Sequence, residues 1–385
     1  MKLLLLEWSA YTQRDVNEIL GENHVQFKSV SYCFKDKNKD DFFLHRFEKY
    51  LSHDQYDAVF TVNYFPLVAI ACQNKGIPYI SWSYDNPLNV PEIEKTLGLE
   101  CNYVFLFDKI QVKQYRDKGF NNVHHLPLAV NTKRLKRISL SSYDWKKYKG
   151  DISFVGKLYP SAFLDLLNPL NEYMTGYLKA FVDAQFKVYG YYFLDELLTE
   201  PLMNKLNSQY EQQLGKGKFH ISKEQFSYAA ASFLTRQERV LLLGILSKYY
   251  QVNLYSREEH PALSKVNYRG SAKYLEEMPK IFMASKINLN ITLKILQTGI
   301  PLRALDILGA GGFLLSNYQE ELAQYFVPEE EFSCYTSIEE AVVKAEYYLK
   351  NEEERKKIAQ GGLKKASTEF SYEKRFQEMF RIVGI

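Results

Sequence analysis

Short apolar runs alternate with amphipathic segments along the first third of the chain, and this alternation limits the fold more than any other feature. Apolar residues at helical spacing predict helices at residues 16–20, 42–51 and 66–76. Between these helices, runs rich in Val, Ile, Leu, Phe and Tyr predict strands at residues 2–6, 25–32, 56–62, 77–83, 103–107 and 123–130. Strands separated by helices are typical of βαβ units on a parallel sheet, so this part is predicted to form one Rossmann-like layer.

The alternation stops between residues 131 and 150, where Lys and Arg alternate with Ser and Tyr, and we interpret this segment as a linker. A new strand at 151–156 ends in glycine, and residues 161–235 have a mostly helical pattern that we interpret as an insertion. The alternation then resumes, with strands at 252–255, 266–269, 287–291 and 313–316 and helices at 337–350, 352–365 and 372–383. We predict an α/β protein of two Rossmann-like domains, residues 1–148 with the C-terminal helix 371–385, and residues 149–370 with the insertion. Such a pair implies a cleft in which ligands bind.

Charge and hydropathy exclude several classes of protein. The 385 residues carry a net charge of +3, too weak for the basic surface of a nucleic-acid-binding protein. No run reaches the roughly 18 apolar residues of a membrane span. The leucines after Lys2 end at Glu7, which makes the run too short for a secretory leader. The four cysteines lack C-x-x-C spacing and favour reduced thiols. We expect a cytoplasmic protein without a transmembrane segment or a nucleic-acid partner.

The most informative segment is 285–317, SKINLNITLKILQTGIPLRALDILGAGGFLLSN. A parallel strand buried on both faces is normally apolar throughout, yet Asn288 and Asn290 share one face of this strand. Polar groups near the carboxyl end of such a strand lie where α/β sheets bind ligands. The two asparagines are therefore candidate ligand-binding residues. The alternative is that they hold the adjacent loop by hydrogen bonds.

A turn and a helix follow this strand, through Thr298-Gly299-Ile300-Pro301. The free N–H groups of a helix N-terminus, with glycine permitting close approach, make a phosphate-binding site. A cation in the first turn opposes the helix dipole, so Arg303 is better explained by an anion in front of it, such as a diphosphate. Asp306, one turn along, offers only acceptors and suits ribose hydroxyls. The alternative is an ion pair between Arg303 and Asp306 on a surface helix.

Weaker candidates follow three other predicted strands. Gly156 would let the backbone approach a phosphate closely, and Lys157 would supply positive charge. The alternative is that the two residues form a structural turn. Tyr255 and Ser256 would stack on and hydrogen-bond a nucleobase, or they belong to a loop. Asp85 follows an apolar strand and suits a general base or an orienting group for an acceptor hydroxyl. Asp and Asn before Pro also make turns that have no chemical role.

At these residues the sequence resembles a known family, the CgeB-like (spore-maturation-protein-like) glycosyltransferases of the GT-B fold. In the C-terminal part the resemblance rests on Val266-Asn267-Tyr268-Arg269-Gly270, Ile287-Asn288-Leu289-Asn290, Gly299-Ile300-Pro301-Leu302-Arg303, Asp306, Gly311-Gly312-Phe313-Leu314-Leu315, Tyr318-Gln319 and Glu339-Glu340. In the remaining part it rests on Tyr79-Ile80-Ser81-Trp82, Asp85, Pro87, Phe107-Asp108, His125-Leu126-Pro127-Leu128-Ala129, Phe154-Val155-Gly156 and Glu238-Arg239. It covers nearly the whole chain.

The resemblance implies that the C-terminal domain holds a nucleotide-sugar donor, that the acceptor approaches from the N-terminal domain, and that the last helix crosses back onto the first domain. The expected donor-binding residues are Gly156, Lys157, Tyr255, Ser256, Asn288, Asn290, Thr298, Gly299, Ile300, Pro301, Arg303 and Asp306. The expected catalytic residues are Arg303 and Asp85. The sequence contains no Asp-x-Asp, the metal motif of the other large class of nucleotide-sugar transferases, and no G-x-G-x-x-G after the first strand. We therefore predict neither a metal nor a cofactor.

Many related retaining transferases carry a glutamate followed eight positions later by a second one. Here the two positions are Thr298 and Asp306, so the ribose contact is kept and the stereochemistry stays open. We expect a hexosyltransferase that moves a sugar from a nucleotide-diphosphate sugar, UDP-linked, to a protein or glycan acceptor. The alternative is a non-catalytic GT-B-like protein that binds a nucleotide or a partner.

Overall fold

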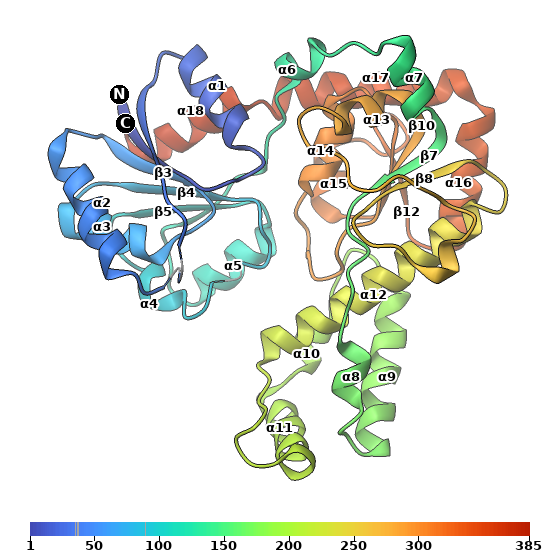
Figure 1. Ribbon diagram of the computed structural model, residues 1–385, viewed down its shortest axis with the longest axis horizontal. Coiled ribbons are helices and arrows are strands. Elements are labelled where there is room, and N and C mark those ends of the chain that lie inside the picture. Colours follow the sequence, from blue (N-terminus) through green and yellow to red (C-terminus); the bar gives the residue numbers. More distant parts are fainter. Residues whose placement is uncertain (35, 37, 89) are drawn as a thin grey trace. The chain divides into compact units, whose positions relative to one another are not determined.

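The computed structural model describes residues 1–34, 36, 38–88 and 90–385 (Figure 1). The chain folds into two compact units. The first unit contains Met1–Lys133, Gly299–Leu305 and Ala366–Ile385, and the second contains Arg134–Thr298 and Asp306–Lys365. Each unit is built around a parallel six-stranded sheet with helices, which confirms the predicted α/β class.

The sheet of the first unit has the strand order β2-β1-β3-β4-β5-β6, and every pairing is parallel. Its leucines at positions 3 to 6 are fully buried, because both faces of the strand are covered. The strands are β1 (Lys2–Glu7), β2 (Gln26–Ser31), β3 (Ala58–Val62), β4 (Tyr79–Ser83), β5 (Asn102–Leu106) and β6 (Val123–His125). The helices are α1 (Gln13–Glu22), α2 (Asp41–His53), α3 (Pro66–Lys75), α4 (Glu94–Leu97), α5 (Lys109–Asp117) and α18 (Tyr372–Val383).

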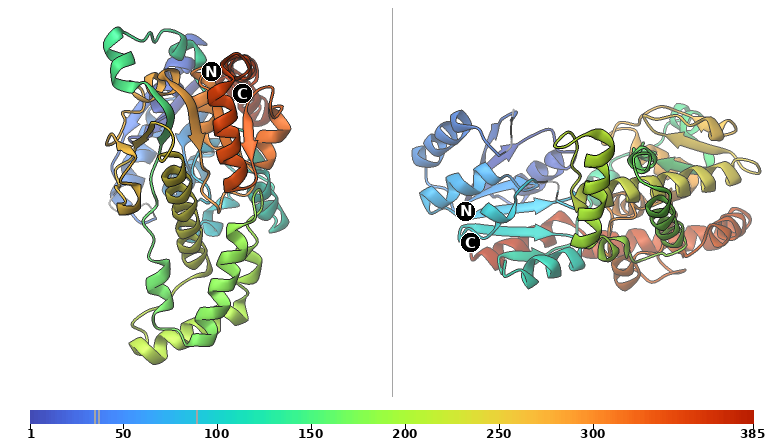
Figure 2. Two further views of the ribbon diagram at one scale, coloured as in Figure 1. Left: turned by 90° about the vertical axis from the view of Figure 1, so that its right-hand side faces the viewer. Right: turned by 90° about the horizontal axis from the view of Figure 1, so that it is seen from below.

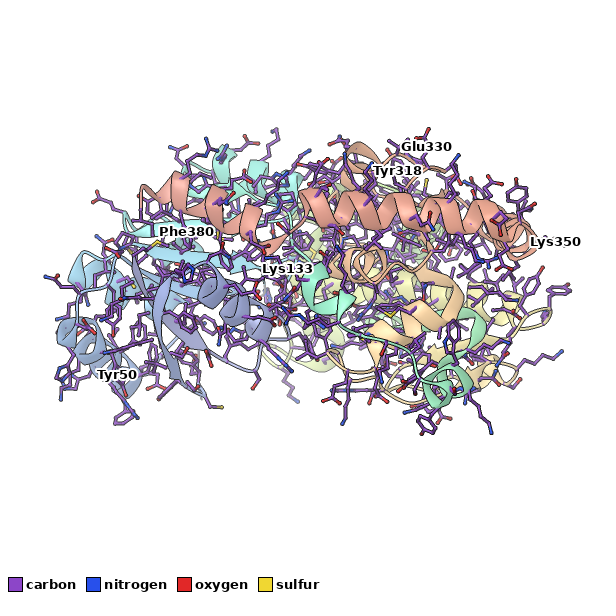
Figure 3. The ribbon with its side chains drawn as sticks, turned by 90° about the horizontal axis from the view of Figure 1, so that it is seen from above. Tyr50, Lys133, Tyr318, Glu330, Lys350 and Phe380 are labelled. Carbon is purple, nitrogen blue, oxygen red and sulfur yellow. The ribbon has the colours of Figure 1, made fainter. Side chains whose placement is uncertain are left out.

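The C-terminal helix α18 completes the first unit, as expected for a last helix that crosses back. Its apolar face rests on the sheet, where the ring of Phe376 lies edge-on to Phe60 of β3 at 5.8 Å between centroids. The same ring contacts Trp82 of β4 at 6.3 Å and stacks on Phe380 at 5.8 Å. Figure 3 shows Phe380 on this helix.

The sheet of the second unit has the order β12-β11-β10-β7-β8-β9, again parallel throughout. Its strands are β7 (Gly150–Val155), β8 (Val252–Tyr255), β9 (Asn267–Tyr268), β10 (Ser285–Asn290), β11 (Leu314–Asn317) and β12 (Ser333–Tyr335). The helices packed with it include α12 (Lys223–Leu246), α13 (Met278–Ala284), α15 (Glu320–Tyr325) and α16 (Ile338–Lys350). Helices α14 (Leu302–Gly309) and α17 (Glu352–Glu369) pass from one unit to the other.

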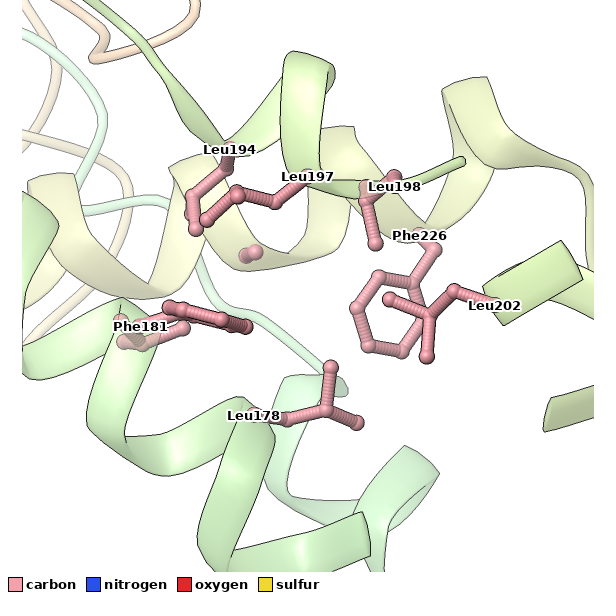
Figure 4. Close-up of a pocket in the computed structure, with 9 residues that line it drawn as sticks. Leu178, Phe181, Leu194, Leu197, Leu198, Leu202 and Phe226 are labelled. Atoms are coloured by element: carbon pink, nitrogen blue, oxygen red, sulfur yellow. The ribbon is translucent and has the colours of Figure 1, made fainter. Parts of the chain in front are cut away.

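Residues 161–235 are mostly helical, as predicted, and they form an arm that projects from the second unit (Figures 1 and 2). Its helices are α8 (Phe163–Leu167), α9 (Glu172–Phe186), α10 (Leu194–Leu197), α11 (Glu200–Leu214) and the first half of α12. The arm has an apolar core of its own, separate from the core around the sheet. That core contains a cavity of about 10 Å³ lined by leucine, phenylalanine, valine and alanine side chains (Figure 4). A space of that size admits at most a single water molecule, so it is a packing defect.

The segment predicted to be an irregular linker differs from that prediction. It contains two short helices, α6 (Thr132–Lys136) and α7 (Ser142–Tyr148). Helix α7 forms because Ser141 and Asp144 make a reciprocal capping box that satisfies two backbone N–H groups. Asp144 and Tyr148, four residues apart, are its buried side.

Candidate functional site

The predicted strand at residues 287–291 is β10, and polar side chains are buried along its carboxyl-terminal half. Asn288 accepts a hydrogen bond from Ser153 Oγ at 2.8 Å and donates to the carbonyl oxygens of Phe282 and Phe313 at 3.1 and 3.3 Å. It is fully buried and ties β10 to its neighbouring segments. These bonds give Asn288 a structural role within the sheet rather than in the adjacent loop, and a contact with a ligand stays a prediction.

Asn290 belongs to a second polar network, at the end of β10. Its amide donates to Thr292 Oγ1 at 3.0 Å and to Ser316 Oγ at 2.9 Å. The side chain of Asn317 accepts from the backbone N–H of Thr292 at 2.8 Å. These bonds fix the first residues of the loop that leads from β10 to α14.

Arg239 of α12 joins this loop to the loop after β7. Its Nε donates to the carbonyl oxygen of Ile291 at 3.1 Å, and its Nη1 donates to the carbonyl oxygen of Lys157. The guanidinium also lies over the rings of Phe154 and Tyr159, 4.9 and 4.8 Å from their centroids. In the sequence Arg239 is part of the family resemblance, but nothing there indicates that it joins these two loops.

A buried ion pair also holds the loop between β10 and α14. Lys294 Nζ lies 2.7 Å from Glu238 Oε2, and the two side chains are only 5% and 0% exposed. The two groups form an ion pair without a hydrogen bond, because the ammonium is not aligned with that oxygen as a hydrogen bond requires. Tyr335 donates to Glu238 Oε1 at 3.1 Å, and the Lys294 ammonium lies 3.8 Å from the ring centroid of Tyr189. Burial, reinforced by the neighbouring carboxylate, raises the pKa of Tyr335.

Thr298, near the end of the loop, is buried against helix α15. Its hydroxyl donates to Glu321 Oε1 at 2.8 Å, while the backbone N–H of Glu321 donates to the carbonyl oxygen of Thr298 at 3.1 Å. Glu321 is fully buried, and no local pattern in the sequence marks this carboxylate. Thr298 stands at the position where related transferases carry the first glutamate. The carboxylate of Glu321, which comes from α15, lies beside that position.

Asp306 and Arg303 lie on α14. Asp306 is 9% exposed and accepts a hydrogen bond from the hydroxyl of Tyr274 at 2.9 Å. Arg303 and Pro301 are half-buried, and Ile300 is buried. Tyr274 was not among the predicted residues, because nothing in its local sequence marks it.

Gly299 makes a close contact inside the first unit. Its backbone N–H donates to Asp108 Oδ2 at 3.1 Å, while Asp108 Oδ1 accepts from Ile110 and Gln111 at the start of α5. A side chain at position 299 would lie 2.8 Å from the carbonyl oxygen of Phe107, so only glycine fits. The amide that we predicted to face a diphosphate therefore faces a carboxylate here, and its role in donor binding stays a prediction.

The candidates after β7 and β8 are held mainly by the fold. The N–H of Gly156 donates to the carbonyl oxygen of Tyr255 at 3.0 Å, while Lys157 is exposed. Tyr255 is buried, which raises the pKa of its hydroxyl to about 12. Ser256 donates to Glu258 Oε2 at 2.6 Å, and that oxygen also accepts from the N–H of Leu158 at 3.1 Å.

Asp85 is an exposed residue at the carboxyl end of β4 in the first unit. Its Oδ2 accepts from Asn63 Nδ2 at 2.6 Å, and Asn63 Oδ1 accepts from the N–H of Tyr84 at 3.0 Å. Asn63 has a φ of 66° and follows β3, so two neighbouring strand ends position this carboxylate. Beside it lies a hollow of about 10 Å³ lined in part by Trp82 and Tyr84.

Two features are absent from residues 1–34, 36, 38–88 and 90–385. No group of three or more His, Cys, Asp or Glu side chains in these ranges is placed to hold a metal ion. No helix in the same ranges combines the length and apolar character that a membrane span requires.

Two Rossmann-like units, each with a parallel six-stranded sheet, and a last helix returning to the first unit define the GT-B fold. Residues 232–381 match a family described as glycosyl transferase-like. This match includes Arg239, the loop after β10, and Asp306. A comparison with curated proteins found no match.

Solved structures share the fold over the full chain. One is Anabaena HepE in complex with UDP and glucose, with 10% identity, a TM-score of 0.52, and coverage of 100% of this chain and 99% of that one. Another is sucrose-phosphate synthase from Thermosynechococcus elongatus, with 10% identity, a TM-score of 0.57, and coverage of 99% and 98%. A glycosyltransferase from Rickettsia africae has 9% identity, a TM-score of 0.52, and coverage of 99% and 97%. Likeness at these identities is a likeness of fold.

Proposed function

We propose that this protein is a metal-independent glycosyltransferase of the CgeB-like kind, which moves a sugar from a UDP-linked donor to a protein or glycan acceptor. The observation that carries the proposal is the match of residues 232–381 to a glycosyl transferase-like family, on a chain whose whole length has the GT-B fold. Anabaena HepE, which shares that fold, has been crystallised with UDP-glucose, and this supports a UDP-linked donor. Metal independence rests on the absence of Asp-x-Asp from the sequence.

The donor is proposed to bind along the loop between β10 and α14. Arg239, Lys294 and Asn290 anchor this loop through buried contacts, so its backbone is held before a donor arrives. Preorganised groups stabilise developing charge more effectively than groups that must first reorient. In the proposed arrangement Arg303 binds the diphosphate and Asp306 accepts from ribose hydroxyls, with Tyr274 orienting the carboxylate through its 2.9 Å hydrogen bond.

The proposed reaction breaks the bond between the anomeric carbon and the donor phosphate oxygen. An acceptor oxygen forms the new bond to that carbon and loses its proton, and the nucleoside diphosphate leaves with the bonding electrons. Negative charge therefore grows on the diphosphate, and the Arg303 guanidinium stabilises it there. Asp85, oriented by Asn63, is the proposed acceptor-side base. The stereochemistry is left open.

The test is the turnover of UDP-sugars by purified protein, read as release of UDP with and without acceptor. We expect the variant Arg303→Ala to lose about 10²–10³-fold in turnover while keeping its fold, the range seen when one group that stabilises transition-state charge is removed. The matched control is Arg381→Ala, which removes an exposed arginine from the last turn of α18. Near-normal turnover in Arg303→Ala would refute the assignment of Arg303.

Two further measurements test the rest of the proposal. Thermal shift against UDP-, GDP-, dTDP- and CDP-sugars identifies the donor, because a specific ligand stabilises the folded state by mass action. Turnover unchanged in EDTA is expected, and loss of turnover that Mg²⁺ or Mn²⁺ restores would contradict metal independence. A protein that binds UDP but never releases it from a UDP-sugar would be the non-catalytic alternative.

A further inference from the structure

The segment from Arg134 to Lys149 concentrates positive charge. It contains six Lys and Arg residues and one acid, Asp144, a net charge of +5. The whole chain has a net charge of +3, so the remainder has a net charge of −2. The segment therefore differs in sign from the rest of the protein, and the proposed sugar transfer makes no use of it.

The structure fixes which side of α7 faces outward. Asp144 is paired with Lys280 at 2.9 Å, and both Lys147 and Tyr148 contact Glu277 Oε1 at 2.9 Å. These contacts attach one side of α7 to α13 and its N-terminus. The acidic charge of the segment is thus directed inward, toward its own unit.

Aromatic rings and lysines without a salt bridge lie on the outer side of the segment. The side chains of Tyr143 and Trp145 are 70% and 47% exposed. Lys136, Lys146 and Lys149 are exposed, and none of them forms a salt bridge with any residue in the described part of the chain. Exposed apolar surface that is rimmed by polar side chains often marks a site where a protein or a membrane binds.

We propose that this surface, residues 134–149, binds peripherally to an anionic lipid bilayer. Lysines near an anionic membrane surface are attracted by its negative potential. Tyr and Trp favour the boundary between lipid and water, where the ring lies among acyl chains and its polar group stays hydrated. A surface segment that carries both kinds of side chain suits a bilayer better than a nucleic acid, for which the chain as a whole is too weakly basic.

The test is sedimentation of the 385-residue protein with vesicles of phosphatidylcholine containing 30% phosphatidylglycerol, compared with pure phosphatidylcholine. We expect binding to the anionic vesicles only, and weaker binding at higher salt. Each lysine near the surface is worth about five-fold in partitioning, so the triple variant Lys136→Ala, Lys146→Ala, Lys149→Ala should bind about 100-fold more weakly.

The matched control removes three lysines from the helical arm, which lies at the other end of the second unit from α7 (Figure 1). Lys179, Lys205 and Lys216 are exposed, and their substitution by alanine changes the net charge equally. We expect binding close to that of the unsubstituted protein. Equal loss in both triple variants would show that total charge matters rather than this surface, and would overturn the proposal.

A second readout tests whether Trp145 enters the membrane. Of the three tryptophans, only Trp145 is exposed in the structure, whereas Trp82 is buried and Trp8 half-buried. Brominated lipids should quench the protein fluorescence, and Trp145→Phe should abolish that quenching. Three results would overturn the proposal: no sedimentation with anionic vesicles, quenching unaffected by Trp145→Phe, or binding of a short DNA duplex as tightly as the vesicles.

Discussion

The buried pair of Lys294 and Glu238 makes a quantitative prediction about what holds the loop after β10. Removing one partner of a buried ion pair leaves an uncompensated charge and costs about 3–5 kcal/mol. Both side chains here are at most 5% exposed, so Lys294→Met should reach that range. Removing both charges restores neutrality: Lys294→Met with Glu238→Gln keeps an acceptor for Tyr335. The double variant should be more stable than the sum of its parts by about 2 kcal/mol.

The assay is urea unfolding followed by circular dichroism, with hydrogen exchange in α12 identifying the transition of the second unit. The matched control is Lys286→Met, which breaks a 2.8 Å pair with Asp151 whose side chains are 44% and 29% exposed. An exposed pair is worth about 1 kcal/mol or less, so this variant should be nearly neutral. The reasoning is refuted if Lys294→Met costs no more than Lys286→Met, or if the two buried substitutions are additive.

Three other substitutions test the packing of glycine positions and the dependence of stability on pH. Gly312→Ala should destabilise by roughly 1–3 kcal/mol, because the new methyl group would lie 2.6 Å from Asn288 Nδ2. Gly176→Ala, in an open part of α9, should stabilise by about 0.5–1 kcal/mol, and equal thermal shifts in the two variants would contradict this. The Lys147 ammonium lowers the pKa of Glu277 from about 4.5 to about 2, so this contact stabilises the fold above pH 4.5 and is lost as pH falls toward 2. Lys147→Met should move that transition to higher pH, as monitored by tryptophan fluorescence in an acid titration.

The alternation of strands and helices was predictable because it is a local signal. Four successive leucines buried on both faces of β1 require no knowledge of distant residues. The same reasoning placed Asn288 and Asn290 at the end of β10 but left two roles open for them. The hydroxyl that Asn288 accepts from belongs to Ser153, 135 positions away, and a pairing at that separation has no local signature.

The groups that hold the candidate site are hidden for the same reason. Arg239 binds the carbonyl oxygens of Ile291 and Lys157, 52 and 82 positions away, and a carbonyl group is common to every residue. Glu321 reaches Thr298 across 23 positions. Helix α7 did have a local signal, a serine three residues before an acid, but Asp144 is a less familiar partner in a capping box than Glu or Gln.

Helix α12 belongs to two hydrophobic cores at once. Its first half, around Phe226 and Leu234, packs into the arm, and its last turns, around Leu242 and Leu246, pack onto the sheet. At 1.5 Å per residue its 24 residues make a rod of about 36 Å, with Arg239 partway along. The helix therefore connects the arm rigidly to the two loops that Arg239 holds by hydrogen bonds. A displacement of the arm would therefore shift Arg239 and, through its hydrogen bonds, the carbonyl groups of Ile291 and Lys157.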